Sequence, residues 1–280
     1  MKKILIPIDF KRSSYDAIDY AVKFFKKEEC QFFFLNAYTY DVNGFNAIHL
    51  LQANDNIFEK PRHTSEISLG QAVNKYIHNN SNEKHRFNAI SECSSLVDAI
   101  KKTIKEVEID LVVLPGKDNA NKSMERYSKN TRSIIDNIRE CPVLIIPSSA
   151  KMHENPKFVL ASYFGLDLPK AELENWYSLI KTANGSIKIV TLSSKEGLSE
   201  LQKANQSKVH SHLEMHVKKP IKIEYIENAA ALKKFAKHHS DYIICLMDRK
   251  PDFWRKLGIT HSRITDLGPL PSTPVIALHR

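Results

Sequence analysis

The sequence predicts an α/β protein in which two doubly wound parallel five-stranded sheets, Rossmann-like in type, follow each other in tandem. Apolar runs typical of strands alternate with segments of helical period, which indicates parallel sheets with helices on both faces. The landmarks of the first half recur in the same order in the second half, which indicates a tandem duplication. We expect domain 1 at 1–147, a polar linker at 148–155 and domain 2 at 156–280, in agreement with a length of 280 residues.

The first half contains five strand-type runs, because short apolar segments rich in β-branched and aromatic residues occur there at regular intervals. We expect strands at 3–8, 31–37, 86–91, 110–115 and 142–146, and helices at 13–27, 65–80, 95–107 and 128–139. Ser13 and Ser14 are expected to cap the first helix, whose apolar face carries Ala17, Ala21, Val22 and Phe25. Residues 38–64 have weak periodicity and predict a long loop with at most one short helix, a place for copy-specific function.

The second half repeats this plan with a shorter segment after its second strand. We expect strands at 157–162, 186–192, 221–226, 241–247 and 274–279, and helices at 169–183, 197–217, 229–239 and 258–267. Residues 148–155 are polar and follow neither the helical nor the strand period, which is typical of a linker.

Composition excludes several classes of protein. The longest apolar runs are far shorter than the roughly 20 residues that a membrane span needs, and strand-type residues begin at once without a signal-like segment, so we expect a cytoplasmic chain with no membrane partner. Cys30, Cys93, Cys141 and Cys245 lack paired spacing, so we expect small buried side chains and neither a zinc site nor disulfides.

The net charge of +9 is concentrated in the second half, in basic clusters within 218–222, 233–239 and 249–256. Such clusters attract nucleic acids or acidic partners in some proteins. No nucleic-acid-binding fold or aromatic stacking motif accompanies them here, so we interpret them as a solvated surface and expect no nucleic-acid partner.

Residues 109–131 are laid out as a strand, a loop and a helix, which is the order of a phosphate-binding loop. The segment resembles the nucleotide motif of the universal stress protein family, Gly-x2-Gly-x9-Gly-Ser/Thr after a strand. In this register the three glycine positions are taken by Pro115, Asp118 and Ser128, and the hydroxyl position by Lys129. Pro115 lacks an N–H donor and Asp118 adds a like charge, so the motif is degenerate.

The resemblance to this family covers both halves. Residues 2–10 are similar to its first strand, whose closing acidic residue, here Asp9, faces the adenine and ribose end of the site, and residues 141–147 are similar to its last strand. Residues 156–164, 240–247 and 273–279 restate the same landmarks in domain 2. The resemblance implies the adenine nucleotide alpha hydrolase-like version of the Rossmann-like fold.

Domain 2 has no recognisable nucleotide motif. Tyr163 stands where domain 1 has Asp9, and the loop after the fourth strand has no glycine before Gly258. We expect Phe253 or Trp254 to pack over the carboxyl ends of the strands and to fill the space that a nucleotide would take.

The candidate nucleotide-binding residues, by resemblance, are Asp9, Gly116, Lys117, Asn130 and Thr131. Asp9 has a second interpretation, as a structural carboxylate that caps the first helix. No metal site is expected, because His210, His212 and His216 lie on a polar helix with no carboxylate or cysteine at ligand spacing along the chain. No arrangement of catalytic residues is recognisable, so we predict no enzymatic activity.

These observations predict a stress-responsive tandem protein that acts as a binding or interaction module, with weak or no ATP binding and no resident cofactor. The alternative is a protein that binds ATP or AMP in domain 1. The resemblance implies that the last strands, Val143–Ile146 and Val275–Leu278, pair within the chain, which would also cover two exposed apolar edges. A homodimer or another protein partner is left open.

Overall fold

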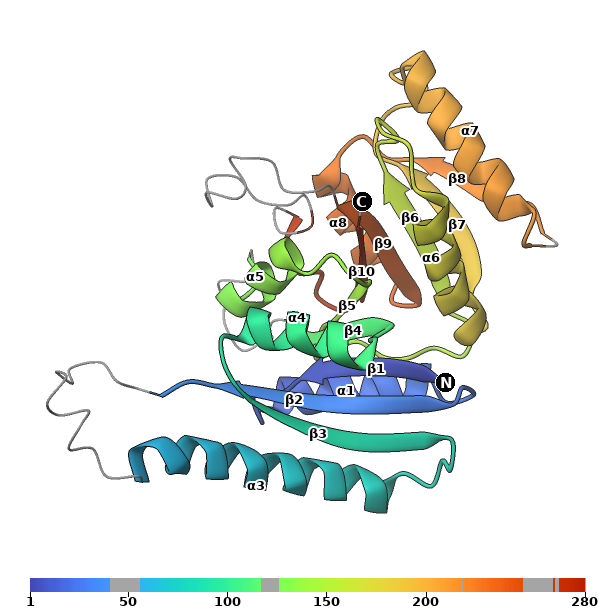
Figure 1. Ribbon diagram of the computed structural model, residues 1–280. Helices are drawn as coiled ribbons and strands as arrows, with labels where there is room; N and C mark the ends of the chain where they lie inside the picture. The colour runs from blue at the N-terminus through green and yellow to red at the C-terminus, as the bar shows by residue number, and fades with distance from the viewer. Residues whose placement is uncertain (41–55, 117–125, 218, 249–263, 265–266, 280) are drawn as a thin grey trace, which may run out of the picture.

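The protein is built around one ten-stranded sheet (Figure 1). The computed structural model describes the chain apart from residues 41–55, 117–125, 218, 249–263, 265–266 and 280. The strand order is β3-β2-β1-β4-β5-β10-β9-β6-β7-β8. The five strands of each half therefore have the same order, with the half's first strand (β1 or β6) in the middle and its last strand (β5 or β10) next to the other half. The α/β class and the duplication are confirmed, and the five strands of each half join into one continuous sheet.

The strands of the first half form where its sequence has apolar runs. Its strands are β1 (Lys2–Pro7), β2 (Cys30–Tyr38), β3 (His85–Cys93), β4 (Leu111–Pro115) and β5 (Val143–Ile146). Its helices are α1 (Arg12–Phe24), α3 (Asn56–Asn79), α4 (Leu96–Val107) and α5 (Lys129–Asn137). All neighbouring strands within this half are parallel.

The second half has the same succession of elements. Its strands are β6 (Lys157–Ser162), β7 (Ser186–Thr191), β8 (Lys222–Tyr225), β9 (Tyr242–Asp248) and β10 (Val275–His279). Its helices are α6 (Lys170–Thr182), α7 (Glu200–Glu214) and α8 (Ala229–Lys237). These strands are also parallel to one another. Most of the expected helix at 258–267 lies outside the described residues.

The two halves are joined where β5 and β10 pair in antiparallel fashion. Val275 faces Ile145, and Ala277 faces Val143. All four side chains are at most 1% exposed. We call this strand pair the β5–β10 junction. It turns the last strand of each half from an exposed edge into the middle of the sheet.

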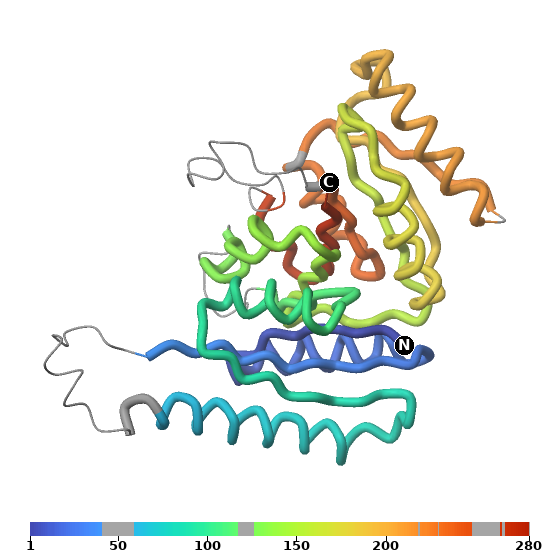
Figure 2. Tube along the Cα trace, in the orientation of Figure 1, coloured from blue at the N-terminus to red at the C-terminus, as the bar shows by residue number. Residues whose placement is uncertain are grey.

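Helices cover both faces of the sheet, so the core has two layers (Figure 2). One layer packs α1, α3, α6 and α7 against the strands, and it includes Phe24, Phe158 and Trp176. The other packs α4, α5 and α8 against the opposite face. Each layer contains buried side chains from both halves. The halves therefore share their hydrophobic core as well as their sheet.

Two local expectations were wrong. Ser13 and Ser14 do not cap α1, because the helix begins at Arg12 with Lys11 in the cap position, and the Ser14 hydroxyl donates to Asp9 instead. Residues 56–64 are helical, since α3 begins at Asn56; the rest of the expected loop includes 41–55, which lie outside the described residues. Cys30, Cys141 and Cys245 are buried as expected, whereas Cys93 is exposed.

The expected linker, residues 148–155, packs in part against the two halves. Ala150 and Met152 are partly buried against the layer that contains Phe158, and the Ser149 hydroxyl donates to the carbonyl of Pro271. Among the described residues, no helix is long and apolar enough to cross a bilayer.

Glu172 lies in the first turn of α6, beside the last strand. Burial raises its pKa and a hydrogen bond from the backbone of His279 lowers it in part, so the pKa lies above its ordinary value. Its Oε2 atom is buried without a hydrogen-bond partner. Arg139 Nη1 lies 2.8 Å from Nδ1 of the same His279, across the junction. A partly buried carboxylate is thus disfavoured in its charged form.

We expect Glu172→Gln to be slightly more stable than the wild type at pH 7. Because the folded-state pKa is raised, the wild type regains stability as the pH falls through that pKa, and the difference should shrink toward about pH 4.5. Thermal unfolding at both pH values should give a melting temperature about 1–2 °C higher for the variant at pH 7. A constant difference across this pH range would contradict the assignment.

Candidate functional site

A cavity of about 210 Å³ opens at the carboxyl ends of the first-half strands. Pro7, Ile8 and Asp9 line it from the end of β1, Asn36 and Ala37 from β2, and Leu114 and Pro115 from β4. The rest of the lining comes from Ser14 of α1, Leu96 of α4, the cap residue Ser128, and Asn130, Thr131 and Ile134 of α5. Open parallel sheets bind ligands at this edge, where the strand order reverses.

Asp9 is held by the start of α1. Its Oδ1 accepts hydrogen bonds from the Ser14 hydroxyl (2.6 Å) and the Lys11 N–H (3.1 Å), and Lys11 Nζ lies 3.1 Å from Oδ2. Burial alone would raise the pKa of Asp9, but these hydrogen bonds outweigh it, so the pKa lies below its ordinary value. Asp9 is therefore an ionised carboxylate that organises the β1–α1 turn and also lines the cavity.

The N-terminus of α5 is capped by its own chain. Ser128 Oγ accepts a hydrogen bond from the Thr131 N–H (3.1 Å) and lies 2.9 Å from the Thr131 hydroxyl. An N-terminal N–H of a helix is the kind of donor that a phosphate would use. Here a serine hydroxyl already satisfies that donor. The Ser128 hydroxyl thus takes the place that an anion could occupy at this helix end.

Gly116 is required by packing. Its N–H donates to the carbonyl of Ile146 (2.6 Å). A Cβ atom at this position would come within 3.0 Å of the Pro147 backbone and 3.1 Å of the Ile146 oxygen. The glycine lets the end of β4 approach the end of β5, and its N–H is committed to that contact. It does not line the cavity.

Gly116→Ala should therefore destabilise the fold whether or not a ligand binds. The clash is with backbone atoms that cannot rotate away, and we expect a loss of about 1–3 kcal/mol in the free energy of unfolding, measured by urea denaturation. Gly70→Ala is the matched control. Gly70 lies in α3, and a Cβ atom added there would meet no other atom within 4 Å. The control should gain about 0.5–1 kcal/mol. Equal stability of Gly116→Ala and the wild type would exclude this packing role.

The cavity brings together Asp9, Asn130 and Thr131 of the five candidate residues. Gly116 lies outside the cavity lining, and Lys117 lies outside the described residues, as does Asp118. Asn36 was missed by sequence reasoning. It lines the cavity, and its side-chain amide donates to the Ile8 carbonyl (2.9 Å), so it ties β2 to the end of β1. A polar side chain at the carboxyl end of an apolar strand was the available signal.

The matching strand end of the second half is covered by α7. Gln202 donates to the Tyr163 carbonyl (2.8 Å), and Asn205 donates to the Phe164 carbonyl (2.9 Å). Phe10 and Phe164, which follow β1 and β6, both have left-handed backbones, with φ of 61° and 52°. The turn that follows the first strand thus has a similar backbone shape in the two halves, while the side chains around it differ. Phe253 and Trp254, expected to fill this end, lie outside the described residues.

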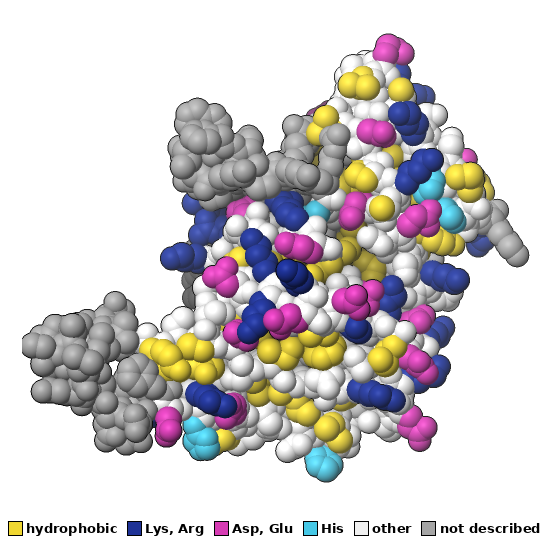
Figure 3. All heavy atoms as spheres, viewed as in Figure 1, with side chains coloured by type: hydrophobic (Ala, Val, Ile, Leu, Met, Phe, Trp, Pro, Cys, Tyr) yellow, Lys and Arg dark blue, Asp and Glu magenta, His cyan; other side chains and the backbone are white. Residues whose placement is uncertain are grey.

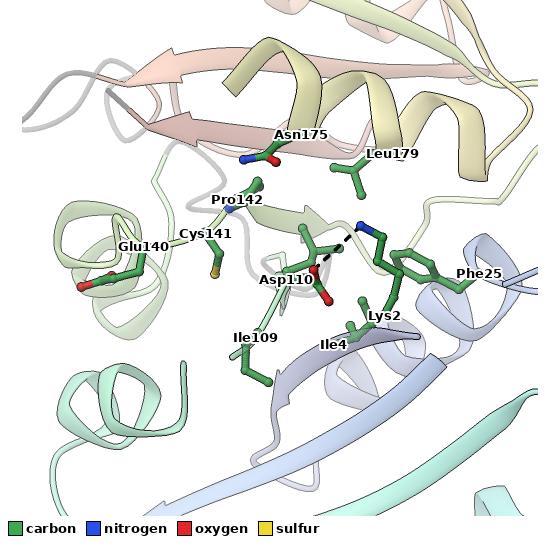
Figure 4. Close-up of a pocket in the computed structure, with 11 residues that line it drawn as sticks. Lys2, Ile4, Phe25, Ile109, Asp110, Glu140, Cys141, Pro142, Asn175 and Leu179 are labelled. Carbon is green, nitrogen blue, oxygen red and sulfur yellow. Dashed lines mark ion pairs between the residues drawn. The ribbon is translucent and has the colours of Figure 1, made fainter. Parts of the chain in front are cut away.

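A second cavity of about 210 Å³ lies at the opposite end of the strands, between the halves (Figure 4). Lys2 and Asp110 cross it as an ion pair of 3.8 Å, while Asn175 and Leu179 reach it from α6. Asp110 also accepts the Lys3 N–H (2.8 Å). Burial raises the pKa of the Cys141 thiol in its wall to about 12. A protonated thiol is a poor nucleophile, so we assign this cavity no covalent chemistry.

His212 of α7 and His216, just after this helix, have a carboxylate close by. Glu174 of α6 lies against His212 and His216. Sequence spacing did not reveal this contact, because the carboxylate comes from a different helix, far away in the sequence. Proximity between helices is invisible to spacing along one helix.

The sequence matches no family model and no curated relative at a significant level. Among solved structures, a universal stress protein from Archaeoglobus fulgidus is similar over 99% of this chain and 98% of its own, with a TM-score of 0.67 and 14% identity. A putative universal stress protein from Pseudomonas aeruginosa matches 100% of this chain and 93% of its own (TM-score 0.58, 10% identity). The cytoplasmic domain of a prokaryotic cation chloride cotransporter matches 99% and 94% (TM-score 0.54, 14% identity). At such identities the likeness establishes a shared fold.

Proposed function

We propose that this chain, which has the tandem fold of universal stress proteins, is a stress-responsive binding or interaction module without catalytic activity. Its domain 1 binds adenine nucleotides weakly or not at all. Its partner is another protein or a second copy of the chain. This proposal goes beyond the fold, because unrelated functions share folds.

The capped N-terminus of α5 carries the proposal. A phosphate at this edge needs free N–H groups, but the Thr131 N–H is bound to Ser128 and the Gly116 N–H is bound to Ile146. Pro115 has no N–H to offer. A nucleotide would have to replace the Ser128 bond and would find few other donors. Each missing hydrogen bond to a charged group costs about 1.5–3 kcal/mol, enough in combination to remove micromolar affinity.

A second candidate is an ATP- or AMP-binding protein that uses the cavity of domain 1. Asp9, Asn130 and Thr131 line one space there, which favours a small polar ligand. The cavity is smaller than the roughly 300–1,000 Å³ of typical ligand pockets, so the first proposal remains the better supported.

Calorimetric titration with ATP and with AMP separates the two candidates. The first proposal expects dissociation constants of about 1 mM or weaker. Mass spectrometry of the supernatant from the denatured, purified protein should then find no stoichiometric nucleotide. Micromolar binding that Asp9→Asn weakens would establish the second candidate, while Ile77→Lys on the exposed part of α3 serves as a control away from the cavity.

The stress role has its own test. The amount of this protein in its native cells should rise on starvation, heat or oxidant treatment, and cross-linking should then capture a partner that does not depend on ATP. An unchanged amount under all these conditions would contradict a stress-responsive role, whatever the outcome of the titrations.

A further inference from the structure

Three side chains from two helices of domain 2 meet at one point. His212 lies in the last turn of α7, His216 follows two residues after the helix ends, and Glu174 comes from α6. One ligand atom from each lies within 4.8 Å of the other two. His212 and His216 are four residues apart, so the turn places both rings on the same side. Figure 3 shows histidine side chains beside acidic ones on this part of the surface.

Both histidines present the same nitrogen to the same oxygen. His212 Nε2 lies 2.9 Å from Glu174 Oε1, and His216 Nε2 lies 3.1 Å from it. In a tetrahedral site with bonds of about 2.0–2.1 Å, ligand atoms lie about 3.3 Å apart. The two distances are close to that value. The side chain of Glu174 is 48% exposed, so it has room to adjust.

One ring nitrogen of His212 lacks a hydrogen-bond partner. Its Nε2 atom is buried, and no well-directed hydrogen bond satisfies it, although the carboxylate oxygen is near. A buried ring nitrogen without a directed partner is costly. A cation between the two nitrogens and the oxygen would replace the hydrogen bond between His216 Nε2 and Glu174 Oε1 and would also give His212 Nε2 a partner.

Tyr177 holds the His216 ring in place. The Tyr177 hydroxyl donates to the His216 carbonyl (2.9 Å), and the Tyr177 and His216 rings lie 4.6 Å apart. Tyr177 is three residues from Glu174 on α6, so one face of that helix supplies both the ligand and the support. Such supporting contacts orient ligands in metal sites.

His210 gives a contrast on the same helix. Its Nε2 lies 3.1 Å from the Ile221 carbonyl, and its Nδ1 lies 3.4 Å from Glu214. Both ring nitrogens are thus engaged with other groups. His210 is therefore outside the cluster, although the sequence places it beside His212.

We propose that Glu174, His212 and His216 bind a divalent transition-metal ion of the zinc type, with an open position for water or for a partner's side chain. Two imidazole nitrogens and a carboxylate oxygen suit zinc better than magnesium or calcium, which prefer oxygen ligands. The ion joins the C-terminal end of α7 to α6. The competing interpretation is a metal-free contact in which the carboxylate only accepts hydrogen bonds.

Zinc titration of the full-length, metal-stripped protein distinguishes the two interpretations. We use the Cys93→Ser background, because Cys93 is the exposed one of the four cysteines and could bind zinc itself. Calorimetry should show one zinc ion per chain, and cobalt should give the visible absorption of a tetrahedral site. His212→Gln, His216→Gln and Glu174→Gln should each weaken zinc binding about tenfold or more.

His210→Gln is the matched control and should change zinc affinity less than about twofold. Zinc should raise the melting temperature of the background protein and of this control, but not that of the three ligand variants. Circular dichroism in chelator verifies that each variant is folded. If zinc does not bind, or binds equally well to the control and to folded ligand variants, the proposal is wrong and the cluster is a metal-free contact.

Discussion

Val275→Lys should lower the free energy of unfolding by about 4 kcal/mol or more, because it places a charge in the buried β5–β10 junction. Val275 is 1% exposed and pairs with Ile145 of the other half. No acidic residue is among its strand neighbours at that position, which are Ile145 and Ile244. Urea denaturation measures the loss. Scattering and limited proteolysis should also show a more open chain, cut between the halves.

Val143→Lys should act in the same way from the other side, because Val143 faces Ala277 across the junction and is fully buried. Ile77→Lys is the control, since Ile77 is 54% exposed on α3. A surface substitution of this kind should change stability by no more than about 0.5 kcal/mol. If the junction variants unfold and scatter like the control, the two strands do not meet in solution.

Phe158→Ala should cost about 3–5 kcal/mol, because it leaves a cavity in the layer that both halves share. Phe158 is fully buried in β6 and meets Phe24 of α1 edge to face, with ring centroids 6.2 Å apart. A double-mutant cycle of Phe24→Ala with Phe158→Ala, followed by urea denaturation, should give a coupling of about 0.5–1.5 kcal/mol between the halves.

A second cycle provides the reference for this coupling. The ring contacts of Phe87 recorded for the described residues are with Phe32, Phe34, Tyr76 and His85, all in the first half. Phe87→Ala and Phe158→Ala should thus be additive within about 0.5 kcal/mol. Coupling of equal size in the two cycles would mean that the Phe24–Phe158 contact is not what joins the halves.

Most strands could be predicted to within one or two residues, for a physical reason. A strand buried on both faces needs an unbroken apolar run, and the runs around Leu111–Pro115 and Val275–His279 are of this kind. The duplication could be seen because the same runs recur in order. Element ends were less visible. The start of α1 depends on Asp9, whose hydrogen bonds place Ser14 inside the helix rather than at its cap.

The candidate site was predicted in part. The location at the carboxyl ends follows from the topology, and Asp9, Asn130 and Thr131 do line one cavity. The roles of Gly116 and Ser128 were not visible, because one depends on how closely the backbone of Pro147 approaches and the other on a hydroxyl that reaches Thr131.

By itself the sequence determined the α/β class and the two copies, because periodicity and residue type are local properties of the chain. Only the tertiary structure decided that each core layer mixes side chains of both halves and that Glu174 lies against His212 and His216. Both results bring together side chains from elements far apart in the sequence. Packing of apolar faces selects such contacts, and no spacing along a single strand or helix encodes them.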